Sequence, residues 1–217
     1  MQVVDNNYLH YYYQETLEMT SETRAELLFR KHGGVLRTSD ALKAGINPAT
    51  FYRMVRSGRL DKLTRGVYQI ADTPPLSHPD LVAVQRRVPD GVICLISALS
   101  FHDLTDQIPR DVYVALNSSA RRPRLAYPPT RFFWFGGLSH EIGIDKHDLD
   151  GTEIRMYSPA KTIADCFKFR GRIGVDVAVE ALRMYLDRPD RDLSKLVEYA
   201  EVCRVLEVMR PYLDALL

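Results

Sequence analysis

The sequence predicts an α+β fold in two parts, a small helical N-terminal domain ending in a hairpin and a larger mixed α/β C-terminal domain. Three observations support this prediction. Helical and extended patterns are mixed along the chain, basic residues concentrate in residues 20–72, and a Thr-Pro-Pro stretch at 73–75 indicates a linker. We therefore expect an N-terminal arm over 1–20, a compact domain over 21–72, and a second domain over 77–217 that ends in long helices.

The distribution of charge singles out the first domain. The 217 residues carry a net charge of only +1. Residues 20–72 nevertheless hold ten Lys and Arg against five Asp and Glu, and the rest of the chain is slightly acidic. A short basic block in an otherwise neutral protein attracts phosphate groups through the release of counterions. Nucleic acid is therefore an expected partner of this domain.

The overall composition, 46% hydrophobic and 26% charged, is that of a globular protein. No apolar run reaches the roughly 18 residues that a membrane helix needs. Residues 1–19 contain no Lys or Arg and no apolar core, so no secretory signal is expected. The three cysteines, Cys94, Cys166 and Cys203, lie in apolar stretches without a Cys-x-x-Cys pair. We expect buried, reduced thiols in a cytoplasmic protein.

The N-terminal domain begins with a predicted helix from Ser21 that stops at two glycines, residues 33 and 34. A short extended segment at 35–37 precedes a second helix over 40–44, capped by Thr38 or Ser39. Asn47 and Pro48 then form a strong start signal for a third helix that reaches about Arg56. Its apolar positions 51, 54 and 55 define one buried stripe.

Two short β-type runs, 60–63 and 66–70, follow the third helix and predict a hairpin. Helix, short helix, turn, helix and hairpin is the order of a winged helix-turn-helix, so we predict that residues near 21–70 bind double-stranded DNA.

The C-terminal domain mixes both kinds of element. Strands are expected at 92–95, 112–116, 131–135 and 153–157, and helices at 80–87, 97–102, 160–169, 174–186 and 193–216. Pro211 should kink or break the last helix. A polar loop at 117–129 contains Arg121, Arg122 and Arg124.

The helical phase of the third helix selects the residues that face DNA. Arg53 is the best candidate for a base contact, because its planar fork can make two hydrogen bonds to guanine. The remaining candidates would contact base edges or the phosphate backbone, from the same helix, from the hairpin, or from free amides and hydroxyls that start the second helix. These are Thr38, Ser39, Thr50, Tyr52, Arg56, Arg59, Lys62 and Arg65. A basic face that binds a protein instead is the competing interpretation, and the charge pattern favours DNA.

Several motifs in a fixed order resemble a known family. GVLRTSDALKAGI at 34–46, FYR at 51–53, GRL at 58–60 and LTRGVY at 63–68 are similar to the N-terminal domain of AbiEi-like antitoxins, which belong to type IV toxin–antitoxin and abortive-infection systems. ICLISAL at 93–99, HDL at 102–104 and YSPAKTIAD at 157–165 resemble motifs of the family's second domain. The tyrosine-rich residues 1–19 have no counterpart in this resemblance.

The resemblance implies two activities. The winged helix would bind inverted repeats in the promoter of its own operon and repress it, as a homodimer or as two cooperating monomers. The C-terminal domain would oppose a cognate nucleotidyltransferase toxin without forming a stable complex with it. A stand-alone transcriptional regulator, whose second domain binds a ligand or mediates dimerisation, is the alternative.

Ser158, Lys161 and Asp165 form the most distinctive polar group of the C-terminal domain. Ser158 and Pro159 start a helix, which places Lys161 and Asp165 four residues apart on one face. A polar antitoxin surface is the functional interpretation, and a capped helix with an internal ion pair is the simpler one, which we favour.

The sequence offers no convincing catalytic, metal or cofactor site, and we expect no enzymatic activity. The serines lack a nucleophile elbow, glycine patterns for nucleotides are absent, and the histidines and acids between 140 and 148 match no zinc spacing. A metal-dependent nuclease remains the enzymatic alternative, since Asp150 and Glu153 approach a carboxylate cluster. That cluster lacks the nearby lysine, which makes the nuclease the least favoured of the three functions.

Overall fold

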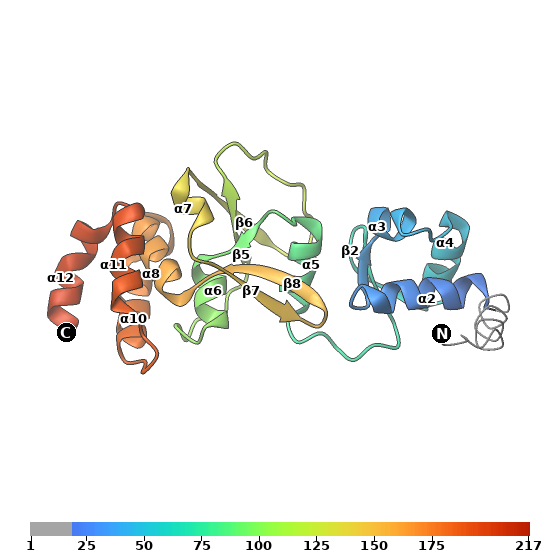
Figure 1. Ribbon diagram of the computed structural model, residues 1–217, viewed down its shortest axis with the longest axis horizontal. Coiled ribbons are helices and arrows are strands. Elements are labelled where there is room, and N and C mark those ends of the chain that lie inside the picture. Colours follow the sequence, from blue (N-terminus) through green and yellow to red (C-terminus); the bar gives the residue numbers. More distant parts are fainter. Residues whose placement is uncertain (1–18) are drawn as a thin grey trace, which may run out of the picture. The chain divides into compact units, whose positions relative to one another are not determined.

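The computed structural model describes residues 19–217 and has the predicted α+β architecture (Figure 1). The chain divides into two compact units whose boundary lies between Pro75 and Leu76. The arm predicted for residues 1–20 lies, except for Met19 and Thr20, outside the described residues. In the described part of the chain, no helix is both long and apolar enough to span a membrane.

The first unit contains the three predicted helices. They are α2 (Ser21–Lys31), α3 (Thr38–Lys43) and α4 (Pro48–Arg56). Thr20, one residue before the predicted start, caps α2 through its hydroxyl, which accepts a hydrogen bond from the Thr23 amide at 3.1 Å. Asn47 caps α4 as predicted, and its side chain accepts a hydrogen bond from the Ala49 amide at 2.8 Å.

A small antiparallel sheet completes this unit. Its strands are β1 (Val35–Arg37), β2 (Leu60–Thr64) and β3 (Val67–Ile70), in the order β1-β3-β2. The β2–β3 hairpin is the predicted wing. The core centres on Phe29 of α2 and Phe51 and Met54 of α4, none of which is exposed, with the rings of Phe29 and Phe51 stacked. The three helices and the hairpin are thus held together by one apolar cluster.

The second unit is built around a mixed five-stranded sheet of order β6-β5-β4-β8-β7. The strands β5 and β6 are parallel, as are β4 and β8, whereas β4–β5 and β7–β8 are antiparallel. The bounds are β4 (Val92–Ile93), β5 (Val112–Asn117), β6 (Thr130–Phe135), β7 (Ile144–Leu149) and β8 (Thr152–Tyr157). One edge of the sheet is therefore β6 and the other is β7.

Strand β7 is not among the strands that the sequence analysis predicts. It pairs with β8 along its full length and joins it through Asp150 and Gly151, which have φ values of 52° and 74°. Two successive residues with positive φ form the turn that matches the twist of a tight hairpin, and Asp-Gly is a preferred sequence for it.

Helices cover the sheet and form the C-terminal end of the chain. They are α5 (Pro79–Arg87), α6 (Leu95–Phe101), α7 (Leu138–Glu141), α8 (Pro159–Lys168), α9 (Arg170–Ile173), α10 (Val175–Leu186), α11 (Leu193–Val202) and α12 (Leu206–Leu216). Helix α8 packs against α6, α10 and α11, and its apolar side chains join those of β5 and β6 in the main core. All three cysteines are buried and free, as predicted.

The predicted helix 193–216 is interrupted, but not by Pro211. It breaks at Arg204, whose φ is 59°, and the amide of Val205 donates a hydrogen bond back to the Ala200 carbonyl at 2.8 Å. The Arg204 amide bonds the Glu201 carbonyl in the same turn. This left-handed turn with two reverse hydrogen bonds is a Schellman-type helix end. Pro211 lies inside α12.

Candidate nucleic-acid interface

The exposed face of α4 is the one that the helical phase predicts. Phe51 and Met54 point into the core, whereas Tyr52, Arg53 and Arg56 are exposed. The Tyr52 side chain is 48% exposed. This helix therefore presents one aromatic and two cationic side chains to solvent, a combination suited to base edges and phosphates.

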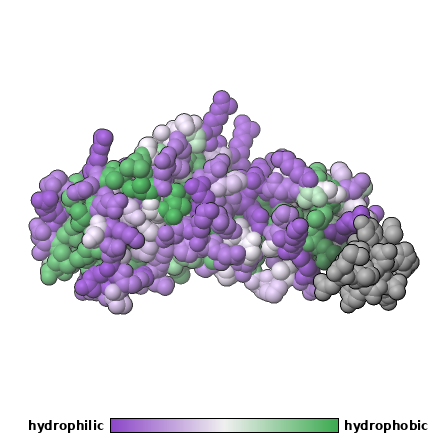
Figure 2. Space-filling view, in the orientation of Figure 1, coloured by the Kyte–Doolittle hydropathy of each residue, from purple (hydrophilic) through white to green (hydrophobic). Residues whose placement is uncertain are grey.

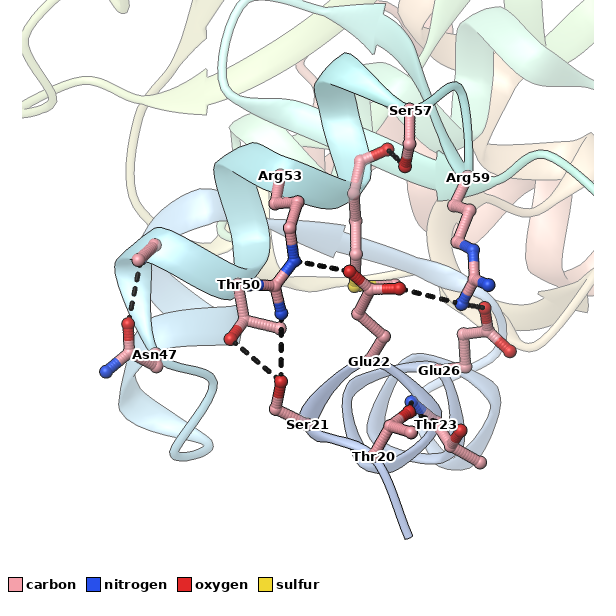
Figure 3. A network of polar contacts seen from close by, with 12 residues as sticks. Thr20, Ser21, Glu22, Thr23, Glu26, Asn47, Thr50, Arg53, Ser57 and Arg59 are labelled. Carbon is pink, nitrogen blue, oxygen red and sulfur yellow. Dashed lines mark hydrogen bonds and ion pairs between the residues drawn. The ribbon is translucent and has the colours of Figure 1, made fainter.

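Acidic residues of α2 hold two arginines, Arg53 on α4 and Arg59 in the turn after this helix (Figure 3). The Arg53 Nε donates to one carboxylate oxygen of Glu22, and its Nη2 donates to the Ser21 hydroxyl at 3.0 Å. The Nη1 of Arg59 lies 3.0 Å from the other Glu22 oxygen and 3.3 Å from a Glu26 oxygen. Glu22 thus bridges both guanidinium groups.

This ion-pair network was not predicted. Glu22 is 31 residues from Arg53 in sequence, so no local spacing rule connects them. Both arginine side chains remain about half exposed, at 52% and 48%. The network therefore fixes where the two cations lie without removing them from the surface.

Thr50 does not lie on the exposed face of α4. Its side chain is only 6% exposed and its hydroxyl donates to the Ser21 hydroxyl at 3.3 Å. On α4 it lies on the buried side next to Phe51, so the prediction of a base or phosphate contact is wrong for this residue. Its physical role is to pack α4 against the start of α2.

Thr38 and Ser39 also differ from the prediction. Helix α3 already begins at Thr38, after Arg37 as the capping position, so neither hydroxyl caps it. The Thr38 amide donates to the Gly66 carbonyl at 3.0 Å, and the Ser39 hydroxyl donates to Asp40 at 3.3 Å. The Thr38 amide thus ties the start of α3 to the wing hairpin and is not available to a phosphate, whereas the Ser39 hydrogen bond stays within α3.

The remaining predicted cations are open to solvent. Lys62 lies on β2, and Arg65 lies in the turn that leads to β3, where Gly66 takes a φ of 79°. Both are exposed, as is Arg56 at the end of α4. Within residues 19–217, no hydrogen bond or ion pair connects these three side chains to another residue.

A comparison with known protein families concerns this unit. Residues 24–71 match a family model described as "Transcriptional regulator, AbiEi antitoxin". This segment of the N-terminal unit is therefore similar to the AbiEi antitoxin domain, and we call it the AbiEi domain below. The resemblance predicted from the motifs is thereby confirmed for this segment.

One solved structure indicates that the fold has a precedent. The chain is similar to the crystal structure of the RV2827C protein from Mycobacterium tuberculosis, with a TM-score of 0.52 and 13% identity. The similarity covers 91% of this chain and 82% of that chain. At this low identity the likeness concerns the fold alone. No curated protein matches the chain.

Beyond the AbiEi domain, the polar group of α8 is part of the core. The side chains of Lys161 and Asp165 are fully buried, and the Nζ lies 2.6 Å from both carboxylate oxygens. The predicted internal ion pair is therefore present. The predicted antitoxin surface is wrong for these two residues, because neither reaches solvent.

Other core groups surround this ion pair. Burial raises the pKa of Asp165, and Lys161 acts in the opposite direction. The Cys203 Sγ donates to the same carboxylate at 3.4 Å, and burial raises the pKa of this thiol to about 12. The lysine Nζ also lies 4.0 Å from the centre of the Tyr157 ring. Ser158 stands at the start of α8 without capping it, and its buried hydroxyl has no partner among the described residues.

The two carboxylates considered for a nuclease have structural partners. Asp150, in the β7–β8 turn, accepts hydrogen bonds from the amide and hydroxyl of Ser77 at 2.8 and 2.9 Å. Glu153 lies 3.0 Å from Lys146 on the exposed side of the same hairpin. Over residues 19–217, no group of three or more His, Cys, Asp or Glu is arranged to hold a metal ion.

Proposed function

We propose that this chain is a DNA-binding antitoxin and transcriptional autorepressor. Its AbiEi domain would bind inverted repeats in its own promoter, with α4 in the major groove and the β2–β3 wing against the backbone or minor groove. The observation that carries this proposal is the set of exposed cations, Arg53, Arg56, Lys62 and Arg65, on α4 and the wing of a domain that matches a regulator family.

The proposed contacts divide by function. Arg53 is the candidate for base recognition, and Tyr52 lies beside it on the same exposed face. Arg56, Arg59, Lys62 and Arg65 would neutralise phosphates. Two copies of α4 are needed for an inverted repeat, so the protein would act as a homodimer or as two monomers that bind cooperatively.

Binding of the full chain to a duplex from its own promoter tests this assignment. The variant Arg53→Ala should weaken specific binding by about 1–3 kcal/mol and relax specificity at one position. Arg65→Ala should weaken binding to every sequence and lower the salt slope by about 0.9. Lys31→Ala is a matched control, because Lys31 is exposed and, nine positions along α2, faces away from Glu22. Unchanged promoter affinity in Arg53→Ala would refute the assignment of α4.

The antitoxin activity is proposed from the family described for residues 24–71. The cognate toxin would be a nucleotidyltransferase, opposed without a stable complex. Co-expression with a nucleotidyltransferase encoded by the adjacent gene should restore growth, and variants of α4 that lose promoter binding should still protect. If no neighbouring nucleotidyltransferase exists, or if co-expression gives no protection, the alternative of a stand-alone regulator is favoured.

A further inference from the structure

The strand β6 and the loop that precedes it form a second basic surface, in the second unit. Between Val112 and His140 the sequence contains four arginines and no Asp or Glu. Three of them, Arg121, Arg122 and Arg124, lie in the loop between β5 and β6, and all three are exposed. Figure 2 shows hydrophilic side chains along this part of the surface.

The loop folds back over the edge strand of the sheet. The indole Nε1 of Trp134 donates a hydrogen bond to the Ala120 carbonyl at 2.9 Å. The Arg122 guanidinium lies 6.0 Å from the centre of the Phe132 ring. Phe132 and Trp134 are two residues apart on β6, so their side chains share one face of the sheet. The loop, and Arg122 in particular, therefore lies beside an aromatic face.

This face leaves aromatic rings in contact with solvent. Trp134 is 39% exposed and Tyr127, in the loop, is 54% exposed. Within the described part of the chain, no carboxylate lies within ion-pair distance of Arg121, Arg122 or Arg124. Exposed rings between uncompensated arginines are the features that bind unpaired nucleotides: bases stack on the rings and phosphates pair with the guanidinium groups.

A duplex would not use these rings, because its bases are already stacked on one another and present only their edges in the grooves. Single strands leave base faces available. We propose that β6 and the loop 118–129 bind single-stranded nucleic acid, with a base stacked on Trp134 and the backbone along the loop arginines. This site is separate from the DNA-binding face of the AbiEi domain and does not depend on it.

The chain contains a single tryptophan, Trp134, which makes the test specific. The full-length protein is titrated with a 15-nucleotide oligouridylate and, separately, a 15-nucleotide oligothymidylate, while tryptophan emission is recorded. Stacking should quench the emission to a saturable limit, and a comparison of the two probes shows whether RNA or DNA is preferred. Binding to the AbiEi domain would not produce this signal, because that domain has no tryptophan.

Two kinds of variant locate the site. Replacing Arg121, Arg122 and Arg124 together by Ala should abolish most of the quenching and lower the salt slope by about two, given roughly 0.7 per phosphate contact on a single strand. Trp134→Ala, followed by anisotropy of a labelled probe, should weaken binding by about 5- to 100-fold. If Trp134→Ala does not fold, the arginine variant alone decides, since it changes only exposed side chains.

A matched control replaces three other exposed cations of the second unit, Arg183, Lys195 and Arg210, by Ala. This variant should bind the single-stranded probes almost as well as the parent protein. Absence of quenching, an equal loss of binding in the control variant, or stronger quenching by a duplex than by the single strands would each overturn the proposal. Loss of promoter binding in α4 variants with quenching intact would show that the two sites are independent.

Discussion

The buried ion pair of α8 gives the sharpest prediction about stability. Lys161 and Asp165 are fully buried, and the lysine Nζ is 2.6 Å from both carboxylate oxygens. The perturbations are Lys161→Met, Asp165→Leu and the double variant. Met has nearly the length of Lys, and Leu has the branched shape of Asp with two methyl groups in place of the oxygens. Each replacement therefore removes one charge without leaving a large cavity.

The size of each effect follows from what the remaining charge still contacts. Breaking a buried ion pair costs about 3–5 kcal/mol, because one charge is left without compensation. In Asp165→Leu the lysine keeps the Tyr157 ring at 4.0 Å, so the loss should be at the lower end. In Lys161→Met the carboxylate keeps one hydrogen bond, from the weakly donating Cys203 thiol, and the more distant charge of Lys168, so the loss should be at the upper end.

The double variant should differ little from the parent protein, because well-packed apolar side chains often replace buried ion pairs without loss. The expected coupling free energy, the sum of the two single losses minus the loss in the double variant, is therefore at least about 6 kcal/mol. Lys161→Met should also regain stability as the pH falls. Burial already raises the pKa of the Asp165 carboxyl, so the folded state takes up a proton that the unfolded chain does not yet bind.

Urea unfolding of the full chain, followed by tryptophan emission, measures these differences. The only tryptophan, Trp134, lies in the second unit and reports on the unit that contains the ion pair. A double variant that loses as much stability as the two single variants combined would refute the reasoning, as would a single variant that loses less than about 1 kcal/mol.

Further predictions concern the AbiEi domain and the second unit. Glu22→Gln should raise the affinity for a promoter duplex by up to about tenfold. It should change the free energy of unfolding by less than about 1 kcal/mol, since exposed ion pairs contribute little to stability. A lower affinity than that of the parent protein in anisotropy assays would contradict this prediction. Burial lowers the pKa of both His102 and His140. The unfolded chain should then take up protons more readily, and the free energy of unfolding should fall as the pH drops below about 6.5; a constant value between pH 7.5 and 5 would argue against it. Gly143→Ala should destabilise by about 1–3 kcal/mol, because the φ is +66° and the new Cβ would lie 2.7 Å from the Cβ of the buried lysine. Gly58→Ala, with a φ of +72° and open space, is the control and should cost less in urea unfolding.

Much of the AbiEi domain could be predicted because local rules determine its elements. Asn47 and Pro48 specify the start of α4, and the spacing of Phe51 and Met54 specifies its buried face. The exposure of Arg53 follows from the same phase. Its partner Glu22 could not be predicted, because the contact depends on how α2 packs against α4.

The second unit shows where local rules are insufficient. The residues of β7 are too polar to match a strand pattern, although Asp150 and Gly151 are a preferred sequence for the turn of a tight hairpin. The spacing of Lys161 and Asp165 predicts their ion pair. Their burial depends on side chains of other elements that pack against α8, such as Cys203 at the end of α11. The sequence of α8 alone does not predict these contacts.

The structure also changes what the charge of the AbiEi domain means for DNA binding. Five arginines and lysines are proposed to contact DNA, from α4, the turn after it and the wing. Two of them, Arg53 and Arg59, are already paired with Glu22 or Glu26. Three, Arg56, Lys62 and Arg65, have no partner in the described chain. If only unpaired cations displace counterions, the salt slope per domain should be about −2.7, against about −4.5 if all five did. The steeper slope would mean that DNA binding breaks the ion pairs between the glutamates and the arginines. The variant Glu22→Gln should then have the same salt slope as the parent protein. The shallower slope would mean that Glu22 and Glu26 stay paired with Arg53 and Arg59 when DNA binds. These two arginines would then determine how the domain is positioned on DNA more than they would add to its affinity.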